Sequence, residues 1–216
     1  MYMCFNQETS IVAFIVGSLF TILNLKKGHI KFNLFIGLIS IFIVIIQLLE
    51  FLIWRNLNDT NINYIASFFI VLITILHPII FLLFFSYVYN KTLPYWLIVF
   101  IIFYIFINKY IFKFSINSND ITTIDKSGKL SWPYLKENSI DKTLIYWILI
   151  FIFIIYIYNL KDKKFNKMLY ATSIITLLTI FVVYLQKPKT FITFGGIFTT
   201  LWCLFCIFIP IIAYII

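Results

Sequence analysis

Long runs of apolar residues, separated by polar segments, dominate the chain. A helix needs about 20 apolar residues to cross a hydrocarbon core about 30 Å thick. Seven runs of this kind are present, at 9–25, 33–54, 64–89, 94–113, 144–160, 169–186 and 191–214. The runs are too long and continuous for the strands of a barrel, so the pattern predicts a bundle of seven transmembrane helices.

The polar stretch 114–143 is the only predicted segment outside the membrane that is large enough to carry structure of its own. It contains charged residues, Ser, Asn and Gly128, and it separates the fourth predicted helix from the fifth. No internal repeat is evident in the rest of the chain. We therefore predict one all-α membrane domain over residues 1–216, with a long loop between helices 4 and 5.

The distribution of basic residues predicts the orientation. Residues 1–8 contain no Lys or Arg, whereas Lys26, Lys27 and Lys31 follow the first apolar run. Short cytoplasmic loops carry an excess of Lys and Arg, so we expect an outer N-terminus and an inner C-terminus. The order is also the reverse of a signal peptide, in which basic residues precede the apolar core. Lysines in 114–143 bring the totals for the two sides almost level, so the short loops decide.

Composition supports a membrane protein and excludes other classes. Hydrophobic residues make up 62% of the chain and charged residues 12%, against roughly half and a quarter in soluble domains. A soluble domain of about 200 residues buries only about 70% of its surface, too little to hide so many apolar side chains. The net charge of +9 comes from lysines beside apolar runs, where anionic headgroups attract them. We expect a lipid bilayer as partner and no nucleic acid, and a homo-oligomer stays open.

One face of the second predicted helix gathers polar residues. Gln47, Glu50 and Trp54 follow at spacings of three and four, which place them on one side, and Ser40 lies two turns earlier. Ionisable residues within a bilayer are costly and mark function by default. We expect Glu50 to face the bundle interior and to bond to Gln47, Trp54, the N-terminal segment or the last helix. A binding site and a structural clasp both stay open, and Glu50→Leu is expected to lower stability.

His77 is the second ionisable residue well inside a predicted helix, and it directly precedes Pro78. Proline removes a backbone donor and leaves a carbonyl free one turn earlier. His77 can serve as the structural donor to such a carbonyl. Alternatively, it is a titrating group in a proton or ion path, because histidine has a pKa near neutrality.

Neither a metal site nor a cofactor site is predicted. Cys203 and Cys206 lie three residues apart in the last apolar run, far from Cys4, and only two histidines are present. This spread gives no zinc ligand set. The last run contains no lysine for a retinal Schiff base, and no motif of a nucleotide-binding or hydrolytic site occurs.

Several short motifs are spread over most of the chain: Met3-Cys4-Phe5 with Ser10 and Gly17, Gln47-x-x-Glu50 with Trp54, Gly128 with Trp132, and Gly195 with Trp202-Cys203. In these motifs the chain resembles an uncharacterised family of multi-pass membrane proteins of bacteria and large DNA viruses. Asn6 stands where the bacterial pattern has Ser, which is similar to the viral branch. The resemblance implies seven membrane helices, in a host or virion membrane if the chain is viral, and supplies no activity.

The predicted topology gathers several of these motifs on the outer face. Glu50 and Trp54 lie near the outer end of their helix, and the same side receives Cys4, Glu8, Trp132, Gly195 and Gly196. We therefore expect an outward-facing polar pocket around Glu50, with His77 deeper, that binds or translocates a small molecule or ion. An enzyme with Glu50 as general acid or base and Cys4 as nucleophile is the first alternative. An accessory or structural viral membrane protein without a ligand is the second.

Overall fold

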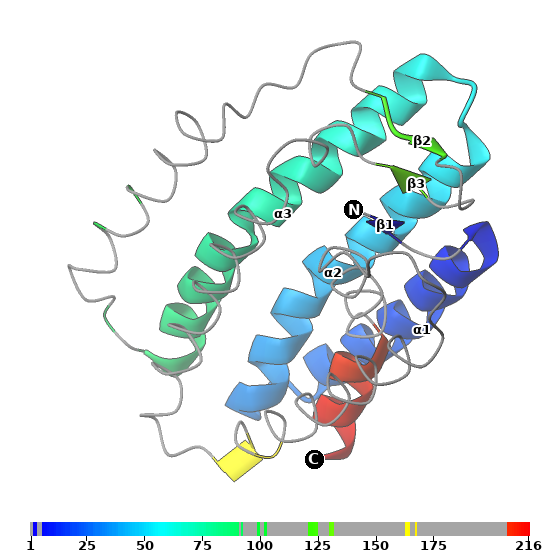
Figure 1. The fold of residues 1–216 in the computed structure, drawn as a ribbon. Coiled ribbons are helices and arrows are strands. Elements are labelled where there is room, and N and C mark those ends of the chain that lie inside the picture. Colours follow the sequence, from blue (N-terminus) through cyan, green and yellow to red (C-terminus); the bar gives the residue numbers. More distant parts are fainter. Residues whose placement is uncertain are drawn as a thin grey trace, which may run out of the picture.

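Three long helices form the main body of the protein (Figure 1). The computed structural model describes residues 2–3, 6–90, 92, 99, 102, 121–124, 130–131, 163–164, 167 and 207–216. Helix α1 covers Gln7–Lys26, α2 covers Lys31–Arg55 and α3 covers Thr60–Tyr89. A further helical segment spans 207–215. The described chain is mostly helical, as the sequence predicts.

Polar residues fix the starts of α1 and α3. The Asn6 side chain accepts a hydrogen bond from the Thr9 amide at 2.8 Å. Asp59 accepts from the amides of Asn61 and Ile62 at 3.0 and 3.1 Å. Helix α3 ends at Asn90, whose φ of 51° is left-handed, a conformation that asparagine tolerates and that stops a helix. The starts of α1 and α3 and the end of α3 therefore follow from local capping chemistry.

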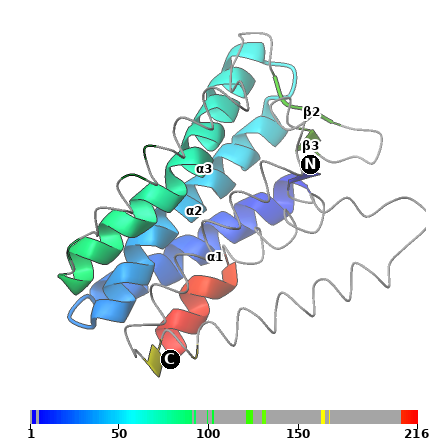
Figure 2. The ribbon, with the colours of Figure 1, turned by 60° about the vertical axis from the view of Figure 1, so that its left-hand side comes forward.

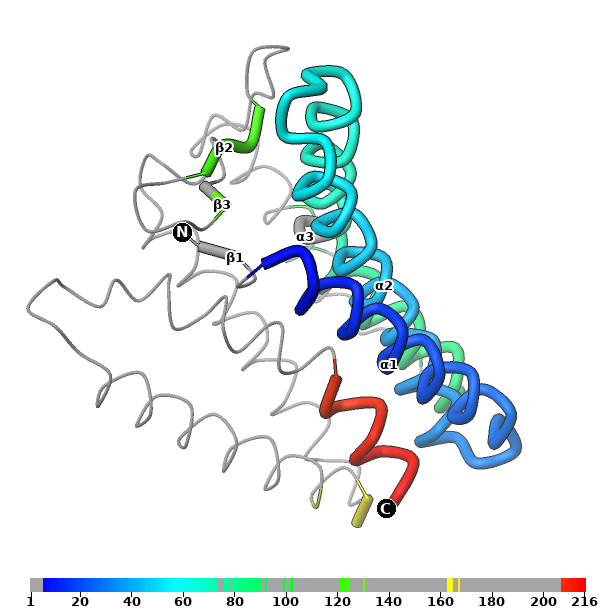
Figure 3. Tube along the Cα trace, turned by 90° about the vertical axis from the view of Figure 1, so that its right-hand side faces the viewer, coloured from blue at the N-terminus to red at the C-terminus, as the bar shows by residue number. Residues whose placement is uncertain are grey.

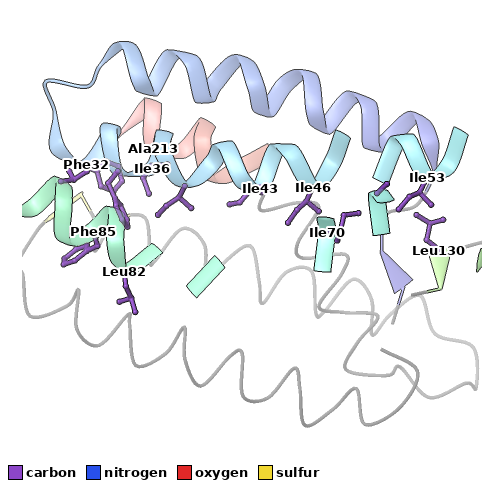
Figure 4. Packing of buried hydrophobic residues seen from close by; sticks show 14 residues of the cluster. Phe32, Ile36, Ile43, Ile46, Ile53, Ile70, Leu82, Phe85, Leu130 and Ala213 are labelled. Carbon is purple, nitrogen blue, oxygen red and sulfur yellow. The ribbon is translucent and has the colours of Figure 1, made fainter. Parts of the chain in front are cut away.

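Helix α2 lies between α1 and α3, and the three helices form one layer (Figure 2). At one end of α2, the Phe35 ring meets those of Phe81 and Phe85 edge to face, at centroid distances of 5.0 and 5.7 Å. Figure 4 shows the buried cluster continuing along α2 to Ile53, which lies beside Leu130 at the other end. The core therefore follows the whole length of the central helix.

In a helix of a soluble protein, apolar side chains face inward and polar side chains face outward. Helix α1 has the reverse arrangement. Its buried residues are small or polar: Ser10, Ala13, Gly17, Thr21 and Asn24. Its exposed stripe is large and apolar, with more than half of each side chain accessible: Val12, Ile15, Leu19 and Ile22. Small inward residues allow close helix packing within membranes, and apolar outward residues suit contact with lipid.

Glycine brings α1 and α2 together near their connecting turn. A Cβ atom at Gly37 would lie 2.8 and 2.9 Å from the Cδ2 and Cγ atoms of Leu25, and 3.2 Å from its backbone nitrogen. No side chain larger than hydrogen fits there without a shift of Leu25. The α1–α2 spacing thus depends on this one residue.

A three-stranded antiparallel sheet lies at the end of the bundle where α2 passes to α3 (Figures 1 and 3). Strand β3, Leu130–Ser131, pairs with β1, Tyr2–Met3, on one side and with β2, Thr123–Ile124, on the other. This sheet departs from the all-α prediction. Two-residue strands carry no hydrophobic periodicity, so the sequence pattern offers no signal for them.

The helical segment 207–215 is fastened at the opposite end of the bundle. Asn24 Nδ2 donates to the Pro210 carbonyl at 2.7 Å, and Asn33 Nδ2 donates to Asn24 Oδ1 at 2.8 Å and to the Ala213 carbonyl at 3.0 Å. Lys27 Nζ donates to the Tyr214 carbonyl at 3.0 Å and lies 3.8 Å from the centre of its ring. The last turn of this helix is therefore held at the turn between α1 and α2.

Two of the described helices, α1 and α2, are each long and apolar enough to cross a membrane. Helix α3 adds two shorter apolar stretches, Thr60–Ile73 and Ile79–Tyr89. These three helices match the first three predicted runs within four residues at each end. The runs at 144–160 and 169–186, nearly all of 94–113, and residues 191–206 of the last run lie outside the described residues.

Candidate functional site

The candidate site is a row of buried polar residues on the face of α2 that meets the bundle interior. Ser40, Gln47 and Glu50 are each 0% exposed. Their spacing of seven and three residues places them on one side of the helix, and Gln47 and Glu50 lie between the buried apolar side chains of Ile46 and Ile53. The expected burial of Glu50 is confirmed.

Several polar atoms of Ser40, Glu50 and Trp54 make no hydrogen bond of regular geometry within the described part of the chain. The Gln47 side chain approaches the Glu50 carboxyl, yet neither carboxyl oxygen of Glu50 has a hydrogen bond of regular geometry among the described residues. The hydroxyl of Ser40 and the buried indole nitrogen of Trp54 likewise lack partners in the described part of the chain. Most buried polar atoms in proteins are hydrogen-bonded, so these atoms are exceptions, as are Thr21 Oγ1 on α1 and Asn33 Oδ1 at the start of α2.

Trp54 differs from the sequence-based expectation. Its helical position is as predicted, one turn beyond Glu50, and its side chain is half-buried against the apolar core. However, its N–H does not donate to Glu50 or to any other described residue. Helical spacing specifies the face on which a residue lies but not its rotamer, and packing of the ring against the core sets its direction.

A second buried polar cluster lies on α3, where the helix meets strand β2. The Asn63 side chain donates to the Thr122 carbonyl at 2.8 Å and accepts from the Thr122 amide at 2.9 Å. The hydroxyls of Ser67 and Thr122 are 2.7 Å apart. This cluster is fully hydrogen-bonded and ties residues 121–124 to the end of the bundle that contains Glu50. No local sequence pattern indicates this cluster, because Asn63 and Thr122 are 59 residues apart.

His77 lies deeper in the bundle than Glu50. It is 7% exposed and its ring centroid is 6.3 Å from that of Phe81. The contacts of Phe35 with Phe81 and Phe85 set the register of α3 against α2. In this register His77 is about level with Ser40, roughly 14 Å from Glu50 along the axis at 1.5 Å per residue. The backbone of α3 continues as a helix through Pro78.

The remaining predicted contributors divide into two groups. Glu8 is exposed in the first turn of α1, where a negative charge complements the helix dipole. Cys4, Trp132, Gly195 and Gly196 lie outside the described residues. Their neighbours are nevertheless informative, because β1 pairs residues 2–3 with residues 130–131. The N-terminal segment and the loop 114–143 thus meet at the Glu50 end of the bundle.

Comparison with protein families, curated proteins and solved structures finds no match to this chain. The geometry of the chain itself therefore has to carry the functional argument. Within the described residues, no group of three or more His, Cys, Asp or Glu side chains is arranged to hold a metal ion. The buried row offers one carboxyl, one amide and one hydroxyl, a set that binds through oxygen atoms and hydrogen bonds.

Proposed function

We propose that the chain is a multi-pass membrane protein of seven helices, with its N-terminal residues outside, that binds and translocates a small molecule or ion through the polar row of α2. The observation that carries this proposal is Glu50, fully buried with neither carboxyl oxygen in a regular hydrogen bond among the described residues. The kinship with the uncharacterised bacterial and viral family stays a prediction.

The two ends of the bundle support an odd number of membrane crossings. Residues 2–3 pair with residues 130–131 at the end where α2 passes to α3, and Leu130 belongs to the same buried cluster as Ile53. Tyr214 contacts Lys27 at the opposite end, where α1 passes to α2. Residues 2–3 and 214 therefore lie at opposite ends, which an odd number of crossings satisfies.

The position of residues 121–131, which belong to the predicted long loop, further supports seven membrane crossings. Helices α1–α3 make three crossings, yet residues 121–131 lie at the end where α1 begins. An even number of crossings must therefore separate residues 2–3 from residues 121–131, so we propose a fourth crossing at 94–113. An odd number must then separate residues 131 and 214, which the predicted helices at 144–160, 169–186 and 191–214 provide. Neither six nor eight crossings meets both conditions.

Charge and exposure support the membrane and its orientation. The turn between α1 and α2 and the helix ends beside it carry Lys26, Lys27 and Lys31, whereas the turn between α2 and α3 carries one basic residue, Arg55. By the positive-inside rule, the first turn is cytoplasmic and the sheet lies outside. The apolar stripe on α1 would then face lipid, which removes the cost of exposing it to water.

The contrast among the polar clusters supports a binding role for the Glu50 row. Asn24, Asn33, Asn63, Ser67 and Thr122, at the two ends of the bundle, each make side-chain hydrogen bonds that join distant segments. The side chains of Ser40 and Glu50 make no such bond within the described chain. Burying polar groups without partners costs free energy, so their retention favours a ligand or water as the partner.

Cysteine accessibility tests this proposal. In a background with Cys4, Cys203 and Cys206 changed to Ser, single cysteines are introduced at Ser40, at Gln47 and, as the control, at Ile15. We expect a small cationic methanethiosulfonate reagent to modify the first two, since translocation requires water to reach the row. Ile15→Cys should stay unreactive, because a thiol in lipid does not ionise. Equal lack of reaction at Gln47→Cys and Ile15→Cys would refute the proposal.

A further inference from the structure

We infer that the ligand of the Glu50 row is a single monovalent cation, either a proton or an alkali-metal ion. This inference rests on the proposed function and adds to it the charge and class of what is bound. Three features carry it: where the other charges of the chain lie, what net charge the site can tolerate, and which atoms it offers.

Glu50 is the only acidic residue that the described part of the chain buries. Glu8 and Asp59 are exposed at the starts of α1 and α3. The basic residues of α1 and α2 lie at helix ends and are exposed or half-buried: Lys26, Lys27, Lys31 and Arg55. On the helices packed against α2, α1 buries no titratable side chain and α3 buries only His77. The carboxyl of Glu50 therefore has no counter-charge among the described residues.

The net charge of a buried site together with its ligand determines which ligand is the least costly to bind. A carboxylate with one monovalent cation is neutral overall, and a neutral group is the least costly to hold away from water. A divalent cation would leave one uncompensated positive charge in the same place. An anion would add a second negative charge and be repelled. One carboxylate in an otherwise uncharged row thus favours a single positive charge.

The atoms of the row agree with this choice. Gln47 and Glu50 place amide and carboxyl oxygens one turn apart. The hydroxyl of Ser40 lies roughly 15 Å from Glu50 along the axis at 1.5 Å per residue, so it belongs to the proposed path and not to this pair. Calcium takes six to eight oxygen ligands, usually with several carboxylates, and transition metals prefer imidazole or thiolate. The described residues hold no cluster of three such side chains.

Ion flux into liposomes tests the inference. The full chain is reconstituted into phosphatidylcholine vesicles containing phosphatidylglycerol, and uptake of H⁺, Na⁺, K⁺, Ca²⁺ and Cl⁻ is followed with separate dyes. Glu50→Gln removes the charge at nearly constant shape, and Asp59→Asn makes the same chemical change at an exposed position. We expect flux of H⁺ or of an alkali ion in the wild type and in Asp59→Asn. Glu50→Gln should reduce it about thirtyfold or more, the usual effect of removing a buried charge partner.

The outcomes separate the inference from the proposed function. The H⁺ and alkali-ion arms distinguish the two sources of positive charge, and Glu50-dependent flux of either one supports the inference. Flux of Ca²⁺ or Cl⁻ that depends on Glu50 overturns the inference while leaving the proposed function in place. If no ion crosses, and none of these ions raises the thermal stability of the purified protein, both are overturned. Equal flux in wild type and Glu50→Gln also refutes the assignment of Glu50.

Discussion

Single residues set both the packing and the chemistry of this bundle. On α2, Glu50 is an example of a chemical constraint and Gly37 is an example of a packing constraint. Glu50 places a carboxyl where no described residue gives it a regular hydrogen bond, so it costs stability. Gly37 lets Leu25 approach to a distance that no other residue allows, so it adds stability. The two residues therefore respond in opposite directions to substitution.

The substitution Gly37→Ala should lower the free energy of unfolding by about 1–3 kcal/mol, the usual cost of overpacking. The added Cβ would lie under 3.0 Å from two atoms of the Leu25 side chain. The measurement is the thermal stability of the purified protein in detergent. In the double variant with Leu25→Ala, the two losses should be less than additive, because the truncated side chain no longer clashes. Additive losses would contradict the close contact.

At the scale of elements, the sequence pattern predicts helices well and small strands poorly. The runs 9–25, 33–54 and 64–89 correspond to α1, α2 and α3, because long apolar stretches and polar caps are local signals. The inward face of α1 could also have been predicted, since Ser10, Ala13, Gly17, Thr21 and Asn24 repeat at spacings of three and four. The pairing of residues 2–3 with 130–131 has no such local signal.

The candidate site was predictable to a similar degree. The face of α2 that carries Gln47 and Glu50 follows from helical spacing, and so does its burial. The sequence could not show that the indole N–H of Trp54 makes no hydrogen bond to the carboxyl, because side-chain direction depends on tertiary packing. Likewise, Asn63 and Thr122 are 59 residues apart in the sequence, so no local pattern indicates their contact.

The contact between α3 and strand β2 should depend on Asn63. Asn63→Ala removes both hydrogen bonds to the Thr122 backbone and leaves two buried groups unpaired, at a cost of about 2–4 kcal/mol. Hydrogen exchange should then become faster at the Thr122 amide. Asn61→Ala is the matched control, since Asn61 is exposed in the first turn of α3. Unchanged protection at Thr122 in Asn63→Ala would show that the segment is held by other contacts.

At the scale of the whole molecule, the described ends of the chain constrain the proposed topology. Cysteines introduced at Asn58 and at Lys163, both exposed, should be modified from opposite sides of the membrane. Asn58 lies in the turn between α2 and α3, on the proposed outer side, and Lys163 lies between two predicted helices on the inner side. An impermeant reagent applied to intact cells should therefore label only Asn58→Cys. Labelling of both from one side would contradict seven crossings.

The central claim is that Glu50 is kept for binding and not as a structural clasp. A clasp would lose stability in Glu50→Leu, as the sequence alone led us to expect. In the structure the carboxyl makes no hydrogen bond to a described residue of another helix or strand, and its side-chain neighbour is Gln47, one turn earlier on the same helix. Replacing an unsatisfied buried polar group by an apolar one is neutral or stabilising.

Thermal stability of Glu50→Leu in detergent, compared with Asn63→Leu, tests this claim most directly. Asn63 is an equally buried polar residue whose side chain is hydrogen-bonded, so Asn63→Leu should lose about 2–4 kcal/mol. Glu50→Leu should unfold at the wild-type temperature or above it, with ion flux lost in liposomes. A loss of stability in Glu50→Leu as large as that in Asn63→Leu would show that Glu50 is a structural clasp and contradict the account.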